Sequence, residues 1–341
     1  MYYRWNNGSR RFPLPKLALP AILVLALSVA CSGGAGQNAS SNSNGKHLGS
    51  IVVAVGVDAS FGSLVAAVKQ GYFQRNGVDA TIKVFPGGPE AVQAVSTGQA
   101  DVTTTGQYSG PLAAAKGAKT KIVAQVETAD NQFGVLASSQ IKSPQDLDGK
   151  TVAMQDGSTS PYYYSLYAQH YGLKNVNVKY IGTPQLVPAL ANGQTDAYFS
   201  WQPYLTRGAE AVNGAHILNY SGQDNIMPER VYMSTSEKVY KNPALATAVL
   251  QSTIQASQWC TDNKAQLGTI LADTYKAPVD QMQTNANVFT YDVVFDKPAQ
   301  DELNRVAEYV SQSQHIPAPK LGDYVDLSFL RAIDPTKVAT P

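Results

Sequence analysis

Apolar and polar positions follow the same order twice along this chain. Residues 51–57 and 151–154 are short apolar runs rich in β-branched residues, and each is followed by small polar residues and a helical pattern that ends at Gly71 or Gly172. A second amphipathic helix and a further strand pattern come next in each copy. The order predicts two α/β units, each built as strand, helix, strand, helix, strand.

The second half of each unit is also a repeat in sequence. The segments PEAVQAVSTGQAD (89–101) and PQLVPALANGQTD (184–196) share proline, valine, alanine, Gly-Gln and aspartate at the same spacing, offset by 95 residues. Each predicts a short helix that ends at the shared glycine and leads into a strand that begins at the shared aspartate. Two copies predict two similar lobes, whereas a solenoid needs at least three.

Two strand-like stretches lie outside the repeats. Residues 133–138 leave the first unit, and residues 231–236 follow the second. We expect the chain to cross between the lobes at both places, which would form a two-strand hinge beside a cleft, the usual position of a small ligand.

The predicted organisation is therefore an α/β fold of two similar lobes. Residues 48–138 and 231–341 are assigned to the first lobe and residues 139–230 to the second. Helical patterns at residues 244–260 and 298–313 are expected to cover the first lobe.

The first 30 residues have the pattern of an export signal. Basic residues precede an apolar run at 17–30 that is too short to cross a bilayer. Residues 31–47 are too polar to fold and predict a flexible tether with a reach of roughly 20 Å. The pair Arg10-Arg11 leaves twin-arginine export open beside the general secretory route.

The junction Ala30-Cys31 resembles the lipobox of bacterial lipoproteins. The resemblance implies that Cys31 is lipidated and that the protein is held on the extracytoplasmic side of the cell membrane. An ordinary secretory cleavage a few residues away is the alternative.

Charge and cysteine content agree with an exported globular protein. The formal net charge is +1 and becomes −3 after processing, because the signal contains four basic residues and no acid. That balance argues against nucleic-acid binding. Cys31 and Cys260 are the two cysteines. With Cys31 lipidated no intrachain disulfide can form, and Cys260 is expected to be a small buried apolar residue.

The sequence offers little support for an enzyme. It contains no nucleophile-elbow, zinc-protease or phosphate-loop motif, and no two of its four histidines have metal-ligand spacing. We therefore predict no catalytic residue, no metal and no cofactor. A sensor or adhesion lipoprotein that lacks a transporter stays an open alternative.

Loops that precede helices supply the candidate binding residues. Unpaired N–H groups and the helix dipole favour an anion at such helix N-termini. In the second unit the loop 155–161 (QDGSTSP) predicts Ser160 as N-cap and Pro161 as the first helical residue, and its glycine lets a ligand approach. A structural cap needs the same residues, and Asp156 would repel an anion unless it pairs with a ligand amine. The site residues predicted here are Gly157, Ser158, Thr159 and Ser160.

Aromatic residues of the second unit divide into two groups. Helical spacing puts Tyr163, Tyr164, Tyr167 and Tyr171 on one face, which predicts core packing. Tyr162 lies off that face and near the cleft, so it is a candidate ligand contact. Trp201 follows the strand pattern at 197–199, where a side chain overhangs the cleft, although the core of the lobe is an alternative position for it.

The repeat places corresponding residues in the first unit. Gln107 matches Gln202, so Gln107 and Tyr108 are candidates there. The other loop of this lobe contains Asp58 and supplies Ser60 and Phe61 as candidates, and Phe61 suits the core equally well.

Five segments of the chain carry a resemblance to a known group of proteins. The chain resembles the solute-binding proteins of ABC importers, in the group of aliphatic sulfonate, taurine and nitrate binders and pyrimidine-precursor (NMT1/THI5-like) proteins. The resemblance implies a type II periplasmic-binding-protein fold, acting as a monomer, that closes on a small solute and delivers it to an ABC permease and its ATPase. The matching segments are residues 71–82, 87–102, 143–160, 196–204 and 234–250.

The resemblance also bears on the ligand. In sulfonate-type relatives the turn that matches residues 157–160 holds the anionic head of the ligand, which implies an aliphatic sulfonate such as taurine. A pyrimidine or other flat heterocycle stacked on Trp201 and Tyr108 is the alternative. The pyrimidine-synthase branch of the group uses a cysteine-rich signature, which this chain lacks.

Overall fold

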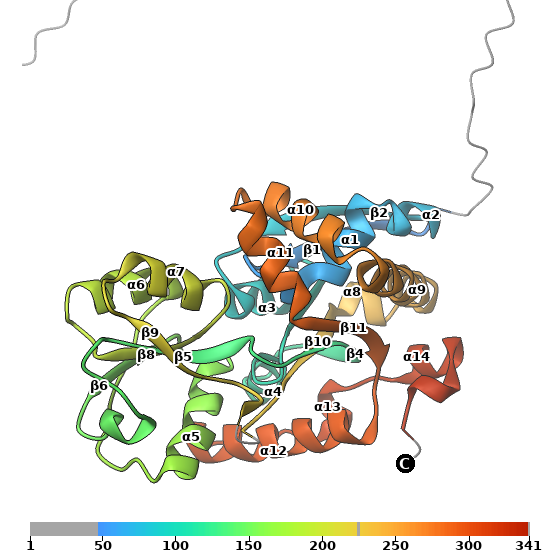
Figure 1. Ribbon diagram of the computed structural model, residues 1–341. Coiled ribbons are helices and arrows are strands. Elements are labelled where there is room, and N and C mark those ends of the chain that lie inside the picture. The colour runs from blue at the N-terminus through green and yellow to red at the C-terminus, as the bar shows by residue number, and fades with distance from the viewer. Residues whose placement is uncertain (1–46, 224–225, 340–341) are drawn as a thin grey trace, which may run out of the picture. The chain divides into compact units, whose positions relative to one another are not determined.

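The computed structural model describes residues 47–223 and 226–339, so the predicted signal peptide, Cys31 and nearly all of the tether lie outside the described residues. Two mixed β-sheets are flanked by helices (Figure 1). The first sheet consists, in spatial order, of β11 (Phe289–Val294), β4 (Thr120–Ala129), β10 (Glu229–Ser236), β3 (Val102–Gly106), β1 (Gly49–Val55) and β2 (Val78–Val84). The second consists of β7 (Asn177–Tyr180), β6 (Thr151–Met154), β8 (Ala197–Trp201), β5 (Phe133–Ala137) and β9 (His216–Tyr220).

The two sheets share one topology. In the first, β1 runs parallel to β2 and β3, and β10 runs antiparallel to both β3 and β4. In the second, β6 runs parallel to β7 and β8, and β5 runs antiparallel to both β8 and β9. The repeat in sequence is thus a repeat in structure, and the prediction of two similar α/β lobes is confirmed.

The aspartate shared by the two repeats has a structural role in both lobes. Asp101 Oδ2 accepts a 2.9 Å hydrogen bond from the Val52 N–H, and Asp196 Oδ2 accepts a 2.8 Å bond from the Thr151 N–H. Each aspartate N–H in turn donates to the carbonyl of the same partner residue. The pair of bonds joins two parallel strands at their amino ends, on the side of the sheet away from the strand carboxyl ends.

The helices predicted within the repeats are confirmed. Each repeat helix is followed by a glycine in the left-handed region, with φ of 74° at Gly98 and 65° at Gly193, as a helix-terminating glycine requires. The helix before Gly172 also ends there. The helices of the repeated units are α1 (Gly62–Lys69), α2 (Tyr72–Arg75), α3 (Gly88–Ser96) and α4 (Ser109–Ala115) in the first, and α5 (Ser160–Tyr171), α6 (Thr183–Ala191) and α7 (Tyr204–Ala211) in the second.

The predicted lobe boundary at residue 138 is wrong. Strand β5 pairs with β8 and β9, so it belongs to the second lobe, and β10 belongs to the first from its first residue, Glu229. The first crossing between the lobes is at residues 130–132, and the second lies between β9 and β10, where residues 221–223 and 226–228 are described. All five residues of β5 are buried, and a fully buried strand carries no pattern that assigns it to one sheet rather than the other.

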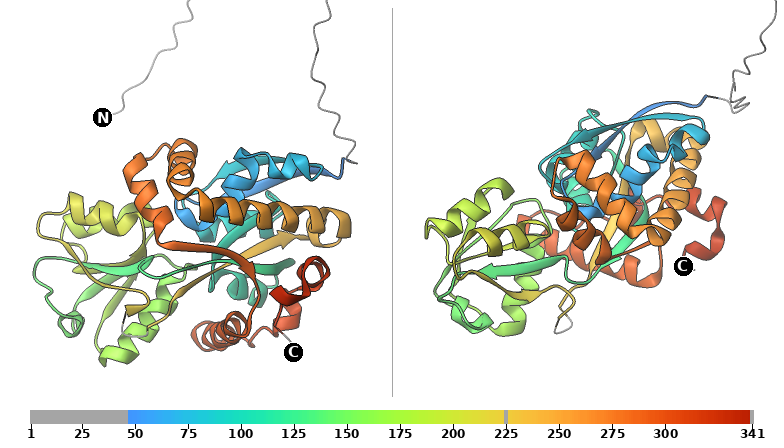
Figure 2. Two further views of the ribbon diagram at one scale, coloured as in Figure 1. Left: turned by 45° about the vertical axis from the view of Figure 1, so that its right-hand side comes forward. Right: turned by 45° about the horizontal axis from the view of Figure 1, so that its top comes forward.

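Most of the C-terminal helices cover the first lobe, as predicted. Three of these helices pack near α1 and supply residues to the core of the first lobe (Figure 2). They are α9 (Pro243–Asp262), α10 (Lys264–Tyr275) and α11 (Val279–Asn287). Cys260 is completely buried there. The short helices α8 (Glu237–Tyr240), α13 (Leu321–Tyr324) and α14 (Ser328–Ile333) complete this part.

Helix α12 (Lys297–Gln314) departs from that expectation because it contacts both lobes. It packs on α4 of the first lobe and passes next to α5 of the second (Figure 1). The Tyr309 hydroxyl donates a 3.0 Å hydrogen bond to the Pro161 carbonyl, and Val306 and Val310 join the core of the second lobe. Within residues 47–223 and 226–339, no helix combines the length and apolar character that a membrane span requires.

Candidate functional site

A partly open cavity lies where the carboxyl ends of the parallel strands of both sheets meet. The space between its lining atoms is about 320 Å³, open solvent included. The first lobe lines it with residues after β1, at the end of β3 and at the N-terminus of α3, and the second lobe with residues after β6 and at the end of β8. This is the position at which open α/β sheets bind ligands. The lining residues are Asp58, Ser60, Phe61, Gly88, Pro89, Thr105, Gly106, Ser109, Gln132, Phe133, Ser158, Thr159, Trp201 and Glu229.

Half of the predicted site residues line this cavity, and they come from both lobes. They are Ser60, Phe61, Ser158, Thr159 and Trp201. Phe61 also packs in the core of the first lobe, so it occupies both of the positions that were expected for it.

Two hydroxyl groups of the loop before α5 differ in role: the Ser158 hydroxyl is hydrogen-bonded within the loop, and the Thr159 hydroxyl is not. The Ser158 hydroxyl donates to the Gln155 carbonyl at 2.7 Å and accepts from the Ser160 N–H at 3.1 Å, so it caps the first turn of the helix. The helix begins at Ser160 with Thr159 as the residue before it, which places the predicted N-cap one residue too late. The Thr159 side chain points toward the other lobe, because a Cβ added to Gly106 would lie 2.5 Å from Thr159 Oγ1.

Trp201 is at once a cavity wall and part of the core of the second lobe. It is the last residue of β8, is 4% exposed, and packs its ring 5.8 Å from the rings of Phe133 and Tyr204. Toward the first lobe, a Cβ added to Gly87 would lie 3.2 Å from Trp201 Cζ2. Trp201 therefore occupies both of the positions predicted for it, because one side of the residue lines the cavity and the other packs in the core of the second lobe.

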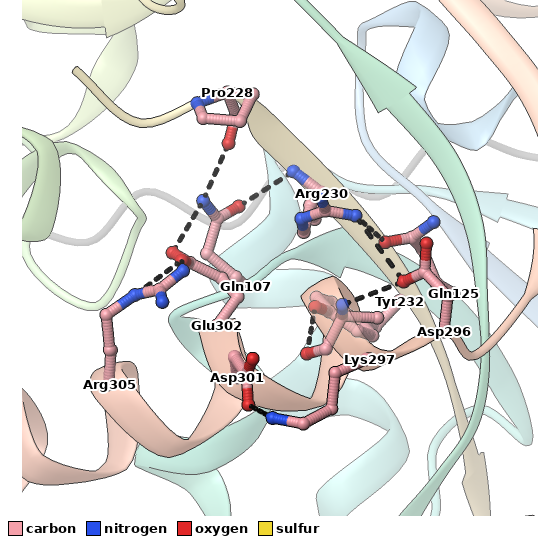
Figure 3. A network of polar contacts seen from close by, with 11 residues as sticks. Gln107, Gln125, Pro228, Arg230, Tyr232, Asp296, Lys297, Asp301, Glu302 and Arg305 are labelled. Carbon is pink, nitrogen blue, oxygen red and sulfur yellow. Dashed lines mark hydrogen bonds and ion pairs between the residues drawn. The ribbon is translucent and has the colours of Figure 1, made fainter. Parts of the chain in front are cut away.

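Gln107 does not line the cavity and belongs to the polar network of Figure 3. Its Nε2 donates to the Pro228 carbonyl at 3.3 Å and to Glu302 at 3.4 Å, and its Oε1 accepts from the Arg230 N–H at 3.1 Å. Gln107 is completely buried and fixes the start of β10, where the chain returns from the second lobe.

The other four predicted residues also lie outside the cavity lining. Tyr108 and Tyr162 are buried against the ring of Tyr309 on α12, with centroids 5.8 Å and 5.1 Å away. Gly157 faces a neighbouring groove between α3 and α4, and Ser160 is completely buried. The prediction of a tyrosine stripe is confirmed, since Tyr163, Tyr164, Tyr167 and Tyr171 all pack in the core of the second lobe.

Two buried carboxylic acids in the cavity wall were not predicted as site residues. Asp58 is 4% exposed and its Oδ1 accepts a 2.7 Å hydrogen bond from the Ser60 N–H. Burial raises the pKa of Asp58 from 3.8 to about 6, against the opposing effect of its hydrogen bonding to Ser60. Glu229 is 3% exposed, and burial together with repulsion from Asp58 and Glu127 raises its pKa well above the usual value.

The cavity is lined by acids and not by bases. Within residues 47–223 and 226–339, no lysine, arginine or histidine lines it. A further acid, Glu127, is completely buried nearby, where its Oε1 accepts hydrogen bonds of 3.1 Å and 2.8 Å from the N–H and hydroxyl of Ser63. Burial raises the pKa of Glu127 to about 8. In the same described ranges, no group of three histidine, cysteine or acidic side chains could hold a metal ion.

Direct hydrogen bonds join the two lobes around the cavity. Gln155 Nε2 donates to Glu90 Oε1 at 2.7 Å, and Arg207 Nε donates to Gln281 Oε1 at 2.9 Å. The Ser109 hydroxyl donates to the Gly157 carbonyl at 2.9 Å. The lobes are therefore in contact beside the cavity.

Two lobes of one topology around a shared cavity define the two-lobed periplasmic-binding-protein fold. The NMT1/THI5 like family matches residues 58–266, which is more than half of the chain, and the chain belongs to this family.

Sequence relatives and a solved structure agree with that assignment. A protein of Brucella abortus (strain 2308) described as a binding protein is 28% identical over 245 residues, covering 69% of this chain and 75% of its own. The aliphatic sulfonates-binding protein of Escherichia coli (strain K12) is 29% identical over 199 residues, covering 57% of this chain and 61% of its own. The alkanesulfonate-binding protein SsuA from Xanthomonas axonopodis pv. citri, solved with MOPS, has a TM-score of 0.70 at 19% identity, covering 81% of this chain and 98% of its own. The relatives support a solute-binding, extracytoplasmic role.

Proposed function

We propose that this protein is the solute-binding component of an ABC importer, held at the outer face of the cell membrane by lipid on Cys31. It acts as a monomer that captures a small organic solute between its lobes and delivers it to a membrane permease and its ATPase. The observation that carries the proposal is the cavity at the strand carboxyl ends, because both lobes line it and neither forms it alone.

Opening and closing would occur at the two crossings between the lobes, whose described residues are 130–132 in the first and 221–223 and 226–228 in the second. Gln107 supports this role because it clamps Pro228 and Arg230 to the first lobe and so limits bending to the residues before them. The hydrogen bonds between the lobes would form on closure and break on opening. A solute that contacts both lobes would shift the equilibrium toward the closed form.

An aliphatic sulfonate of the taurine type is the first candidate solute. The N-termini of α3 and α5 reach the cavity through Pro89 and Thr159, where backbone N–H groups favour an anionic head. Two relatives in Escherichia coli bear the names aliphatic sulfonates-binding protein and taurine-binding periplasmic protein.

A flat heterocycle is the second candidate. The cavity has three aromatic walls, Phe61, Phe133 and Trp201, of a kind that suits a ring. We propose a non-enzymatic role with either solute, and the named sequence relatives, which are binding proteins, support it. A sensor role without a transporter would be indicated if no permease and ATPase genes adjoin the gene of this protein.

A thermal-shift screen followed by small-angle scattering tests the proposal. Sulfonates, nitrate, pyrimidines and small aromatic amines and acids would be screened, since a ligand at a hundred times its Kd adds roughly 2.7 kcal/mol to stability. A stabilising solute should also reduce the radius of gyration. If no compound of any charge class stabilises the protein or reduces its radius, the solute-binding proposal is wrong.

A further inference from the structure

Glu229 is a buried acid without a partner, and it faces the cavity. Its side chain is 3% exposed, it lines the cavity, and among the described residues its Oε2 has no hydrogen-bond partner. It lies against the bare Cα of Gly106, where an added Cβ would be 3.2 Å from Glu229 Oε1. A buried acceptor that lacks a hydrogen-bond donor destabilises the free protein. This free-energy cost is removed only when another molecule supplies the donor.

Asp58 lies on the other side of the same strand end. Strand β3 runs between β1 and β10, and Val231 of β10 pairs with Gly106 at the end of β3. The start of β10 and the loop after β1 therefore flank the end of β3 at the same edge of the sheet. Asp58 and Glu229 extend from these two positions into one cavity.

Among the residues that the structure describes, no base neutralises these two acids. Arg230 is adjacent to Glu229 in sequence, but its Nη1 donates to Gln125 at 2.7 Å, outside the cavity lining. Arg207 of α7 stacks on Tyr204 and donates to Gln281. A countercharge in the cavity must therefore come from a proton or from the ligand.

We propose that the solute carries a cationic group, such as a protonated amine or amidine, which binds between Asp58 and Glu229. The inference rests on the proposed solute-binding function and narrows its substrate class. The ammonium would supply the donors that Glu229 lacks, and charge-assisted bonds to both acids would fix its position. The aromatic face of Trp201 adds attraction for a cation.

A cation-binding position between Asp58 and Glu229 favours some candidate solutes over others. Taurine has an ammonium for the acids and a sulfonate for the helix N-termini across the cavity, and a protonated amino-heterocycle has a cation and a ring for Phe61 and Trp201. A plain alkanesulfonate or nitrate has no group for Asp58 and Glu229 and would place its charge against them.

Two pairs of probes that differ in one charged group test the proposal. Isethionate has a hydroxyl where taurine has an ammonium, and benzamide is the neutral counterpart of benzamidine. Calorimetric titration at pH 7.5 should show that the cationic member of a pair binds at least about tenfold more tightly than its counterpart, as expected for a hydrogen bond to a charged group.

Two substitutions test whether the preference for a cationic probe comes from the acids of the cavity. Asp58→Asn retains an oxygen for the Ser60 N–H, and Glu229→Gln retains the shape of the side chain, so both should fold. Each should lower the affinity for the cationic probe on the order of 10- to 100-fold and reduce the preference within the pair. Asp156→Asn is the matched control, because Asp156 lies on the cavity-lining loop of the second lobe but is exposed, and it should change neither.

The contrary results are distinct. The cationic assignment is overturned if isethionate or benzamide binds as tightly as its counterpart, if neither cationic probe binds, or if Asp58→Asn and Glu229→Gln keep the preference. A neutral or anionic solute that closes the protein would overturn the cationic assignment and leave the transport proposal intact. The transport proposal fails separately, when no solute of any charge stabilises or closes the protein.

Discussion

The side-chain amide of Gln155 donates a 2.7 Å hydrogen bond to Glu90, and this bond joins the two lobes beside the cavity. Gln155 is 7% exposed, and its Oε1 accepts from the Thr183 hydroxyl at the start of α6. The amide orientation is therefore fixed by its own lobe before it meets the other. Such a preset donor lowers the entropy cost of closing.

Gln155→Ala should weaken solute binding more than it weakens folding. Loss of a hydrogen bond to a carboxylate should cost about 1.5 to 3 kcal/mol of binding, since the bond exists only when the lobes meet. Calorimetric titration with the solute found by screening gives the affinity, and chemical denaturation gives the stability. Gln93→Ala, an exposed glutamine on α3, is the control and should leave both unchanged. Equal affinity of Gln155→Ala and wild type would show that this bond does not hold the closed form.

Gly106→Ala should prevent closure while each lobe stays folded. The added Cβ would lie 2.5 Å from Thr159 Oγ1, closer than real Cβ contacts allow, and the clash is between lobes. We expect at least a tenfold loss of affinity, about 1.4 kcal/mol or more, with little change in stability. The radius of gyration should no longer fall when solute is added.

Gly322→Ala is the matched control for that variant. Gly322 lies in α13, and a Cβ added there would have no atom within 4 Å. The control should bind solute as the wild type does. If Gly106→Ala also binds normally and closes, the contact between Gly106 and Thr159 does not belong to the closed state.

Substitutions of Ser158 and of Thr159 should have different effects on stability and affinity, although both residues line the cavity. The Ser158 hydroxyl is used within its own loop, so Ser158→Ala should cost about 1 kcal/mol of stability, as loss of a helix cap does. Thr159→Val removes a hydroxyl that faces the other lobe and should lower solute affinity about 2- to 10-fold with little change in stability. Denaturation and titration of both variants check the division. The reverse pattern would make Ser158 the ligand contact and Thr159 the structural residue.

The repeat made the topology predictable, because the signals that define each unit are local. Gly98 and Gly193 end equivalent helices, and Asp101 and Asp196 make equivalent strand contacts. The position of Trp201 at a strand end could be predicted for the same reason. The repeat did not predict which residues of these loops line the cavity. Gln107 was expected in the cleft by analogy with Gln202, but neither glutamine lines the cavity, and Gln107 donates a hydrogen bond to Glu302 of α12.

One of the two cavity acids, Glu229, could not be found from the repeat. Glu229 comes from the stretch between the second unit and the C-terminal helices, so it has no equivalent in the other copy. It reaches the cavity because β10 returns from the second lobe and pairs antiparallel with β3, a contact of two segments more than 120 residues apart. Local patterns carry no information on such a pairing.

Cys31→Ser should release the protein from the membrane fraction. Diacylation at Cys31 would supply two lipid chains, which give firm membrane binding where one chain is marginal. Fractionation of cells and mass spectrometry of the mature N-terminus are the measurements. A Cys31→Ser variant that stays in the membrane fraction, together with wild type of unlipidated mass, would rule out the lipid anchor.

Affinity for an amine-bearing solute should rise with pH between about 5 and 8. Burial raises the pKa of Asp58 from 3.8 to about 6, so Asp58 is mostly protonated in the free protein at pH 5. Burial and the charges of Asp58 and Glu127 also raise the pKa of Glu229 well above its usual value, which favours its protonated form. A bound cation favours their ionised forms and lowers both pKa values. The complex therefore binds fewer protons than the free protein, and linkage requires that affinity increase with pH, at most tenfold per pH unit for each proton released. An aliphatic amine stays protonated over this range, as lysine does with a pKa of about 10.4.

Calorimetric titration of taurine at pH 5, 6, 7 and 8, in two buffers of different ionisation enthalpy, measures both the affinity and the protons released. Asp58→Asn should remove the part of the rise centred near pH 6, because the group that titrates there is gone. The charged and titratable groups that face Asp58 are Glu127, Glu229, Tyr204, Tyr275 and Tyr291. The pKa of each of the three tyrosines is raised above its usual 10, so the tyrosines do not contribute between pH 5 and 8. An affinity that is constant or falls from pH 5 to pH 7 would mean that the cavity acids do not contact the ammonium, since every such contact must release protons in that interval.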